Sequence, residues 1–260
     1  SAILHCMTEL GGRVKTFTVG FELNKVEQRE KFNQDFDLAK RTASYYKAEH
    51  HEVLVSENDI LDILPRAIWH LDEPISNATI IPMFRLAELA KKDVAVVLGG
   101  DGGDELFGGY ERYQWSRRIS FYQKLMPSAS RQFLEKFDSR FRKINTPAGI
   151  ERFALFHFSK ENTIARFLNR DFNRSGATEE FFARSFFQTP SDDFEKTFMD
   201  TDCRSWLADE SLSRTDKMSM AFGLEARVPF LDLEMVNLAH SLPTREKVGL
   251  FNQKIVLKKA

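Results

Sequence analysis

The sequence predicts an α/β fold built on a parallel, doubly wound sheet, with a helical region appended to it. Over the first hundred residues, segments rich in β-branched and aromatic residues alternate with helix-length amphipathic segments. The apolar run 94–98 shows no polar alternation, which is typical of a strand buried on both faces of such a sheet. Ligands of this fold bind at the carboxyl ends of the strands.

The first βα unit begins with a strand predicted at 15–21, rich in β-branched and aromatic residues and expected to be buried. The segment 51–55 predicts the second strand. Between them lies a charged stretch in which apolar residues stand at helical spacing. These residues are Phe32, Phe36, Ala39 and Ala43.

Ser56 and Asp59 have the spacing of a capping box at the start of the next helix. Pro65 should kink or restart that helix, because proline has no N–H to donate. A further helical pattern covers 83–90, directly before the apolar run 94–98.

Over residues 110–200 the pattern predicts amphipathic helices packed by aromatic side chains, with no strand. An aromatic stripe can also stack nucleic-acid bases, but the net charge of -1 provides no basic excess for that function. The phenylalanines expected to pack the helices include Phe133, Phe137, Phe141, Phe153, Phe156, Phe167, Phe181 and Phe182.

The overall composition favours small-molecule ligands, since 37 basic and 38 acidic side chains nearly cancel. Cys6 and Cys203 are too few for a disulfide framework and have no metal-ligand spacing, so we expect a cytoplasmic protein. No apolar run is long enough for a membrane span, and no signal peptide is apparent. Because the chain starts at Ser1 and stops within a helical pattern, we expect it to be part of a longer protein.

The stretch 98–110 combines three glycine pairs with three acids. Backbone N–H groups of glycines can approach a phosphate, whereas Asp101, Asp104 and Glu105 would repel a bare polyphosphate. ATP with Mg²⁺ satisfies both features, because carboxylate oxygens hold that cation.

Three other glycine-rich motifs do not match this stretch. A P-loop requires a Gly-Lys-Ser/Thr ending, and a dinucleotide fingerprint requires a small residue where Glu105 stands. An EF-hand requires a glutamate at its twelfth position. A simple turn whose acids cap the next helix stays open, although ordering so many glycines is costly.

Two segments carry a family resemblance. The stretch 99–110 resembles the signature S-G-D/E-G-x-D-E-x-F-G-G-Y of the asparagine synthetase family, and 216–232 resembles its second hallmark. Shorter stretches at 16–21, 50–52 and 72–74 follow in the family's order. The resemblance implies a sheet of the PP-loop ATP pyrophosphatase (adenine nucleotide hydrolase-like) type, with a nucleotide-binding part at 1–109 and a mainly helical part at 110–260 completing one synthetase domain.

The resemblance also implies site residues. Asp101 takes the position of an acid tied to formation of the acyl-adenylate, and Asp104 that of a Mg²⁺ ligand at the pyrophosphate. Lys254, in a stretch similar to G-x-x-K-x-x-L, would neutralise charge on the phosphate and the attacked carbonyl. The positions expected to bind ATP are Ser1, Val19, Gly99, Gly100 and Gly102.

Departures from the family pattern concern Gly99, which replaces a serine, and Lys258, which replaces an arginine. Ser1 to Ile3 resemble the tail of the pyrophosphate loop S-G-G-x-D-S-S-x-I, whose aspartate would be a second Mg²⁺ ligand. We therefore expect residues 1–260 alone to turn over weakly or not at all. Cys6 is not an N-terminal nucleophile, so ammonia would come from a glutaminase domain outside this chain.

The implied reaction converts aspartate and ATP to β-aspartyl adenylate and pyrophosphate, after which ammonia from glutamine yields asparagine. A β-lactam-forming synthetase, an amidotransferase of polysaccharide assembly and a non-catalytic nucleotide-binding domain remain alternatives, and a homodimer stays open. Some residues also allow structural roles. Glu225 with Arg227 suits an ion pair that locks the turn or, alternatively, a substrate contact. Asp216 and Lys217 suit equally a role in fixing the start of the Met-rich segment and a contact with substrate, and Lys254 also suits a solvated helix position.

Overall fold

The computed structural model describes two compact units, one of mixed α/β structure and one of helices. The first unit comprises Ser1–Asp101 and Leu207–Asp232, and the second comprises Gly102–Trp206 and Leu233–Ala260. Among the described residues, no helix is both long enough and apolar enough to cross a membrane. The described residues are 1–23, 32–73, 77–138, 140–157, 177–187 and 193–260.

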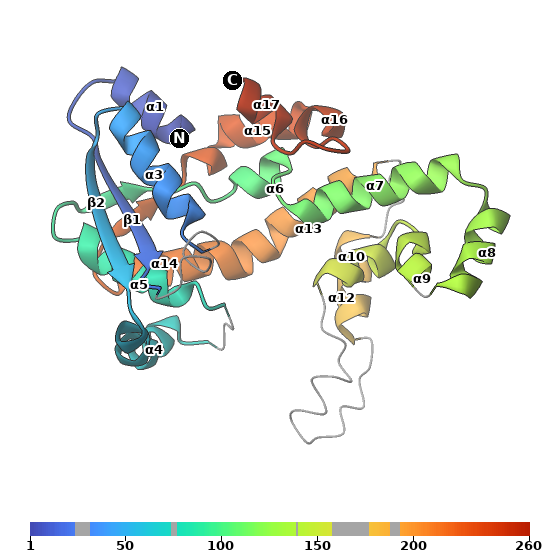
Figure 1. Ribbon diagram of the computed structural model, residues 1–260, viewed down its shortest axis with the longest axis horizontal. Helices are drawn as coiled ribbons and strands as arrows, with labels where there is room; N and C mark the ends of the chain where they lie inside the picture. Colours follow the sequence, from blue (N-terminus) through green and yellow to red (C-terminus); the bar gives the residue numbers. More distant parts are fainter. Residues whose placement is uncertain (24–31, 74–76, 139, 158–176, 188–192) are drawn as a thin grey trace. The chain divides into compact units, whose positions relative to one another are not determined.

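In the first unit, helices follow strands in the predicted α/β order (Figure 1). A π-helix, η1 (Trp206–Leu212), belongs to this unit from Leu207 onward. The other elements are α1 (Ala2–Glu9), β1 (Lys15–Phe21), α3 (Gln34–Tyr45), β2 (Glu49–Val55), α4 (Glu57–Leu71), α5 (Ile80–Ala90), β3 (Val96–Leu98), α14 (Ser213–Met220), β4 (Glu225–Arg227) and the 3₁₀ turn η2 (Pro229–Leu231).

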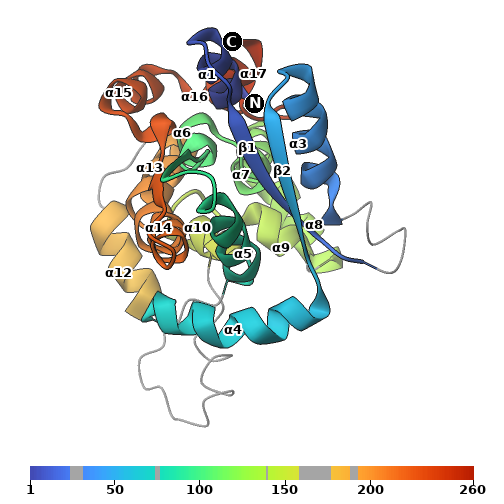
Figure 2. The same cartoon turned by 90° about the vertical axis from the view of Figure 1, so that its left-hand side faces the viewer.

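The strands pair in parallel, as predicted. β1 pairs with β2 along its whole length, with Val19 opposite Val53, and β3 pairs with β4, with Leu98 opposite Arg227. Figure 2 shows β1 and β2 side by side, with α3 along them. Within the described residues the four strands form two separate two-stranded sheets.

Burial of the strands differs from the prediction. Val96 and Leu98 of β3 are 40% and 41% exposed, so the expectation of a strand buried on both faces is wrong. In β1 only Gly20 is buried, and the other residues are half-buried. Each strand has one hydrogen-bonded neighbour among the described residues. Apolar composition alone could not reveal how much of each strand its neighbours cover.

The predicted capping box at the start of α4 is confirmed. The Ser56 hydroxyl accepts a hydrogen bond from the Asp59 N–H, and the Asp59 carboxylate accepts one from the Ser56 N–H. The predicted restart at Pro65 is wrong, because α4 continues through it. Pro65 lies on the exposed face, where water can satisfy the carbonyl that lacks a partner.

The core of the first unit is formed by α4 and α5 with residues of α14 and β2. Phe84 of α5 contacts Phe222 edge-on, with ring centroids 4.6 Å apart, and Met218 of α14 is fully buried. This packing places α14 against α5. The buried members of the main cluster are Val55, Ile63, Ala67, Leu71, Ile80, Ile81, Phe84 and Met218.

The second unit is helical in its described residues, as predicted. Its short first helix, α6, begins inside the glycine-rich stretch. The elements are α6 (Gly103–Phe107), α7 (Glu111–Leu125), α8 (Ser128–Phe137), α9 (Arg140–Asn145), α10 (Ile150–His157), α12 (Ala177–Phe186), α13 (Phe194–Arg204), α15 (Leu233–Ser241), α16 (Thr244–Lys247) and α17 (Ile255–Lys259).

Aromatic packing in the second unit is confirmed for some of the predicted phenylalanines. Phe153 is fully buried and meets Phe198 edge-on at 4.9 Å, and Phe156 and Phe182 pack on the same cluster. Phe133 and Phe181 are 58% and 60% exposed, so their assignment to the core is wrong. Phe167 and the side chain of Phe137 lie outside the described residues.

Candidate functional site

The glycine-rich stretch begins at the carboxyl end of β3 and passes from one unit into the other. Gly99, Gly100 and Asp101 belong to the first unit, and Gly102 begins the second. Asp101 therefore lies in the first unit, and Asp104 and Glu105 lie in the second.

In the first unit, the two glycines after β3 have different surroundings. The Gly99 N–H donates to the Arg227 carbonyl at 2.8 Å, which continues the β3–β4 pairing by one bond. A Cβ on Gly99 would lie 3.2 Å from Asp101 Oδ2, whereas a Cβ on Gly100 would meet nothing within 4 Å. The backbone of Gly100 is thus open on the side where a ligand could approach.

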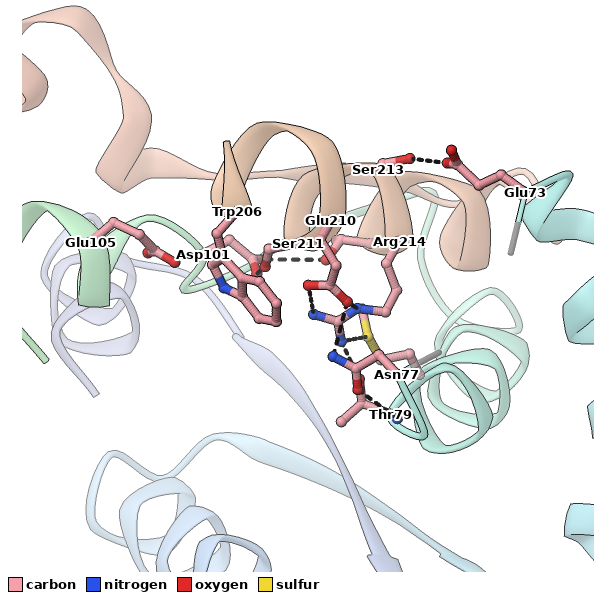
Figure 3. Close-up of polar contacts among 12 residues, drawn as sticks. Glu73, Asn77, Thr79, Asp101, Glu105, Trp206, Glu210, Ser211, Ser213 and Arg214 are labelled. Atoms are coloured by element: carbon pink, nitrogen blue, oxygen red, sulfur yellow. Dashed lines mark hydrogen bonds and ion pairs between the residues drawn. The ribbon is translucent and has the colours of Figure 1, made fainter. Parts of the chain in front are cut away.

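Asp101 is held by two hydroxyl groups that the sequence analysis did not single out. Ser211 Oγ lies 3.1 Å from Asp101 Oδ1 (Figure 3), and Thr215 Oγ1 lies 3.5 Å from Asp101 Oδ2. Both hydroxyls stand four residues apart, shortly before the second hallmark segment. That spacing was the available signal.

The remaining predicted nucleotide residues of this unit lie on α1 and β1. Ser1 is exposed and stands at the N-cap of α1, where its side chain makes no capping bond. Val19 packs against the main apolar cluster from β1. Their contribution to nucleotide binding stays a prediction.

In the second unit, Asp104 and Lys254 meet as an ion pair. Lys254 Nζ lies 2.9 Å from Asp104 Oδ1, with side chains 31% and 37% exposed, respectively. Asp104 stands in α6, and Lys254 is the N-cap of α17 in a left-handed conformation with φ 51°. Two residues chosen for separate roles in phosphate chemistry are therefore neighbours.

Gly109 is the residue that makes room for this ion pair. A Cβ at that position would lie 1.8 Å from Asp104 Oδ1 and 2.2 Å from Lys254 Cε. Any side chain there has to displace both groups. Gly102, at φ 85°, adopts the left-handed conformation that glycine tolerates at the N-cap of α6.

Glu105 points into the second unit, unlike its neighbour Asp104. It is 2% exposed and accepts a hydrogen bond from the Tyr110 hydroxyl at 2.7 Å, while Trp206 Nε1 donates to the same hydroxyl at 3.3 Å. Burial raises the pKa of the Glu105 carboxyl. This acid is therefore not available to a cation at the surface of the loop.

The donor set fits magnesium that arrives with a nucleotide. Across the described residues, no group of three or more His, Cys, Asp or Glu side chains could hold a metal ion. Asp104 offers one partly exposed carboxylate, and Mg²⁺ is commonly bound by one or two carboxylates together with substrate phosphates and waters. Asp104 suits that arrangement and does not form a metal cage of its own.

The second hallmark segment has structural contacts. Lys217 donates to the Glu73 carboxylate at 2.7 Å and to the Leu71 carbonyl, contacts that fit the structural alternative for this residue. Arg227 Nε lies 2.7 Å from Glu225 Oε1, with both side chains more than half exposed. The predicted Glu225–Arg227 ion pair is confirmed, but its exposure limits its contribution to stability.

Comparison with known proteins gives one family. The family model described as asparagine synthase matches residues 1–260. The chain is 29% identical over its full length to asparagine synthetase [glutamine-hydrolyzing] 1 of Bacillus subtilis, covering 41% of that protein. It is 31% identical, over 95% of the chain, to a putative asparagine synthetase [glutamine-hydrolyzing] of Mycobacterium bovis, covering 38% of it. The chain thus spans about 40% of the length of these relatives.

Proposed function

Because the chain belongs to the asparagine synthase family, we propose that the protein uses ATP to activate the side-chain carboxylate of aspartate for amide formation. A carboxylate resists attack by ammonia because its leaving group would be oxide. The aspartate carboxylate therefore attacks the α-phosphorus of ATP, pyrophosphate leaves, and ammonia from glutamine displaces AMP from the β-aspartyl adenylate to give asparagine.

The observation that carries this proposal is the 2.9 Å contact between Lys254 and Asp104 next to Gly109. The lysine provides positive charge where negative charge grows on the phosphate and the attacked carbonyl. Asp104 would hold magnesium, which when bound neutralises charge on the departing pyrophosphate. Asp101 has the role of the acid that supports adenylation.

The nucleotide site in this proposal includes Ser1, Val19, Gly99, Gly100 and Gly102. The open backbone at Gly100 supports phosphate approach, and the parallel pairing of β1 with β2 and of β3 with β4 supports a PP-loop type of sheet. The functional division into 1–109 and 110–260, and a homodimer, stay predictions. So does a cytoplasmic location, which rests on two cysteines that are both free.

The direct test is pyrophosphate release from ATP by the full-length protein, measured with aspartate, with other carboxylic acids and with no acid. We expect release that depends on aspartate, and asparagine formation when glutamine or ammonium is added. Release with a different acid would assign the protein to a related adenylating synthetase. ATP binding without release under any condition would contradict catalysis and favour a nucleotide-binding domain.

A further inference from the structure

Asp101 receives one hydroxyl group on each of its carboxylate oxygens. Ser211 Oγ donates to Oδ1 at 3.1 Å, and Thr215 Oγ1 is 3.5 Å from Oδ2 (Figure 3 shows the first contact). A carboxylate offers about four lone-pair sites. Two donors on opposite oxygens fix the plane of the group and leave the other sites for a donor on a substrate.

The two hydroxyls come from one continuous helical segment. Ser211 lies near the end of the π-helix η1, and Thr215 lies in the first turn of α14. Residues four apart lie on the same face of a helix, and π-helical turns frequently occur at functional sites. Ser211 is 7% exposed, so its hydroxyl points into the protein toward Asp101.

An ion pair between Glu210 and Arg214, also four residues apart, holds the segment of η1 and α14 in place. Arg214 Nε donates to Glu210 Oε1 at 2.8 Å, and Arg214 Nη2 donates to Glu210 Oε2 at 3.2 Å. Asn77 donates to Glu210 at 2.9 Å, and Arg214 also contacts Thr79 at the start of α5 (Figure 3). Arg214 is only 9% exposed, so this bidentate pair restrains the junction between η1 and α14.

We propose that Ser211 and Thr215 are positioning residues that set the orientation of the Asp101 carboxylate for the adenylation step. This inference rests on the proposed function, because the catalytic role of Asp101 belongs to it. The competing interpretation is that the hydroxyls only satisfy a half-buried carboxylate. It predicts that their loss lowers stability and leaves the activity of the folded protein unchanged.

The test compares Ser211→Ala, Thr215→Val and the double variant with a matched control in the full-length protein. The control is Ser213→Ala, since Ser213 lies in the same helix and its hydroxyl contacts Glu73 instead of Asp101. We expect Ser211→Ala to lower kcat for aspartate-dependent pyrophosphate release roughly 10-fold, the effect of one hydrogen bond to a charged group. Thr215→Val should have a smaller effect because its contact is longer.

The KM for ATP and the urea midpoint of Ser211→Ala should stay close to those of the control, and a crystal structure of the double variant should show the Asp101 carboxylate rotated. An unchanged kcat, or a loss explained by a lower urea midpoint, would overturn the inference. If the wild-type protein releases no pyrophosphate, the proposed function fails. In that case the crystal structure of the double variant alone tests the positioning role. An Asp101 carboxylate that keeps its orientation there would contradict the role proposed for Ser211 and Thr215.

Discussion

Lys254 Nζ lies 2.9 Å from Asp104 Oδ1, so a cation of the protein already occupies the carboxylate that is proposed to hold magnesium. The two side chains are partly exposed; Asp104 lies in α6, and Lys254 is the N-cap of α17. With magnesium pyrophosphate bound, the Asp104 carboxylate would contact the magnesium ion and the Lys254 ammonium group would contact the phosphate oxygens. The pair is therefore better suited to ligand binding than to stabilising the fold, since exposed ion pairs contribute little.

Replacing Lys254 by methionine should lower kcat for aspartate-dependent pyrophosphate release by roughly 10²–10³, as for removal of one well-placed donor to a developing charge. Lys259→Met is the matched control, because Lys259 is an exposed lysine in the helix that Lys254 caps. Steady-state kinetics of the two variants tests this. Equal rates would mean that Lys254 is a solvated helix lysine.

Gly109→Ala should separate Asp104 from Lys254 without unfolding the protein. The added Cβ would overlap with Asp104 Oδ1 and Lys254 Cε, which are the ends of side chains and can move. We expect a change of less than about 1 kcal/mol in the free energy of unfolding, together with a strong loss of pyrophosphate release. A crystal structure that keeps the ion pair at its present distance would contradict this prediction.

Glu105 predicts a pH dependence of stability. Burial raises the pKa of this carboxyl above 4.5 in the folded state, so folding favours the protonated form. Its stabilising contribution is complete below pH 4.5 and is lost as the pH rises through the folded pKa. Urea unfolding between pH 4 and 8 should therefore show wild type losing stability relative to Glu105→Gln. Glu111→Gln changes an exposed position and keeps Glu105, so its pH dependence should follow that of wild type.

Asp202 should be essential for the stability of the second unit. It is fully buried and accepts hydrogen bonds from Arg112 Nε at 3.0 Å and from the Tyr113 hydroxyl. Asp202→Ala would leave the Arg112 charge without its carboxylate, at a cost of about 3–5 kcal/mol in the free energy of unfolding. Arg227→Ala, which breaks an exposed pair, should cost less than about 1 kcal/mol. Similar urea midpoints for the two variants would contradict this contrast.

Local sequence features predicted the elements that depend on neighbouring residues. The capping box of Ser56 and Asp59 was predictable because both partners lie within one turn. The burial of β3 and the positions of Phe133 and Phe181 were not, because exposure depends on what distant segments cover. The same is true of the contact between Ser211 and Asp101, because these residues stand 110 positions apart in the chain.

The sequence by itself determined which segments the proposed site draws on: a loop of glycines and acids after a strand, and a lysine near the end of the chain. The tertiary structure alone decided what each acid of that loop does. Asp101 accepts a hydrogen bond from Ser211, Asp104 forms an ion pair with Lys254, and Glu105 is buried and accepts a hydrogen bond from Tyr110. There are two physical reasons. Glycines such as Gly102 adopt backbone angles that set the direction in which the neighbouring side chains point. Contact partners such as Ser211 and Lys254 lie in segments far along the chain.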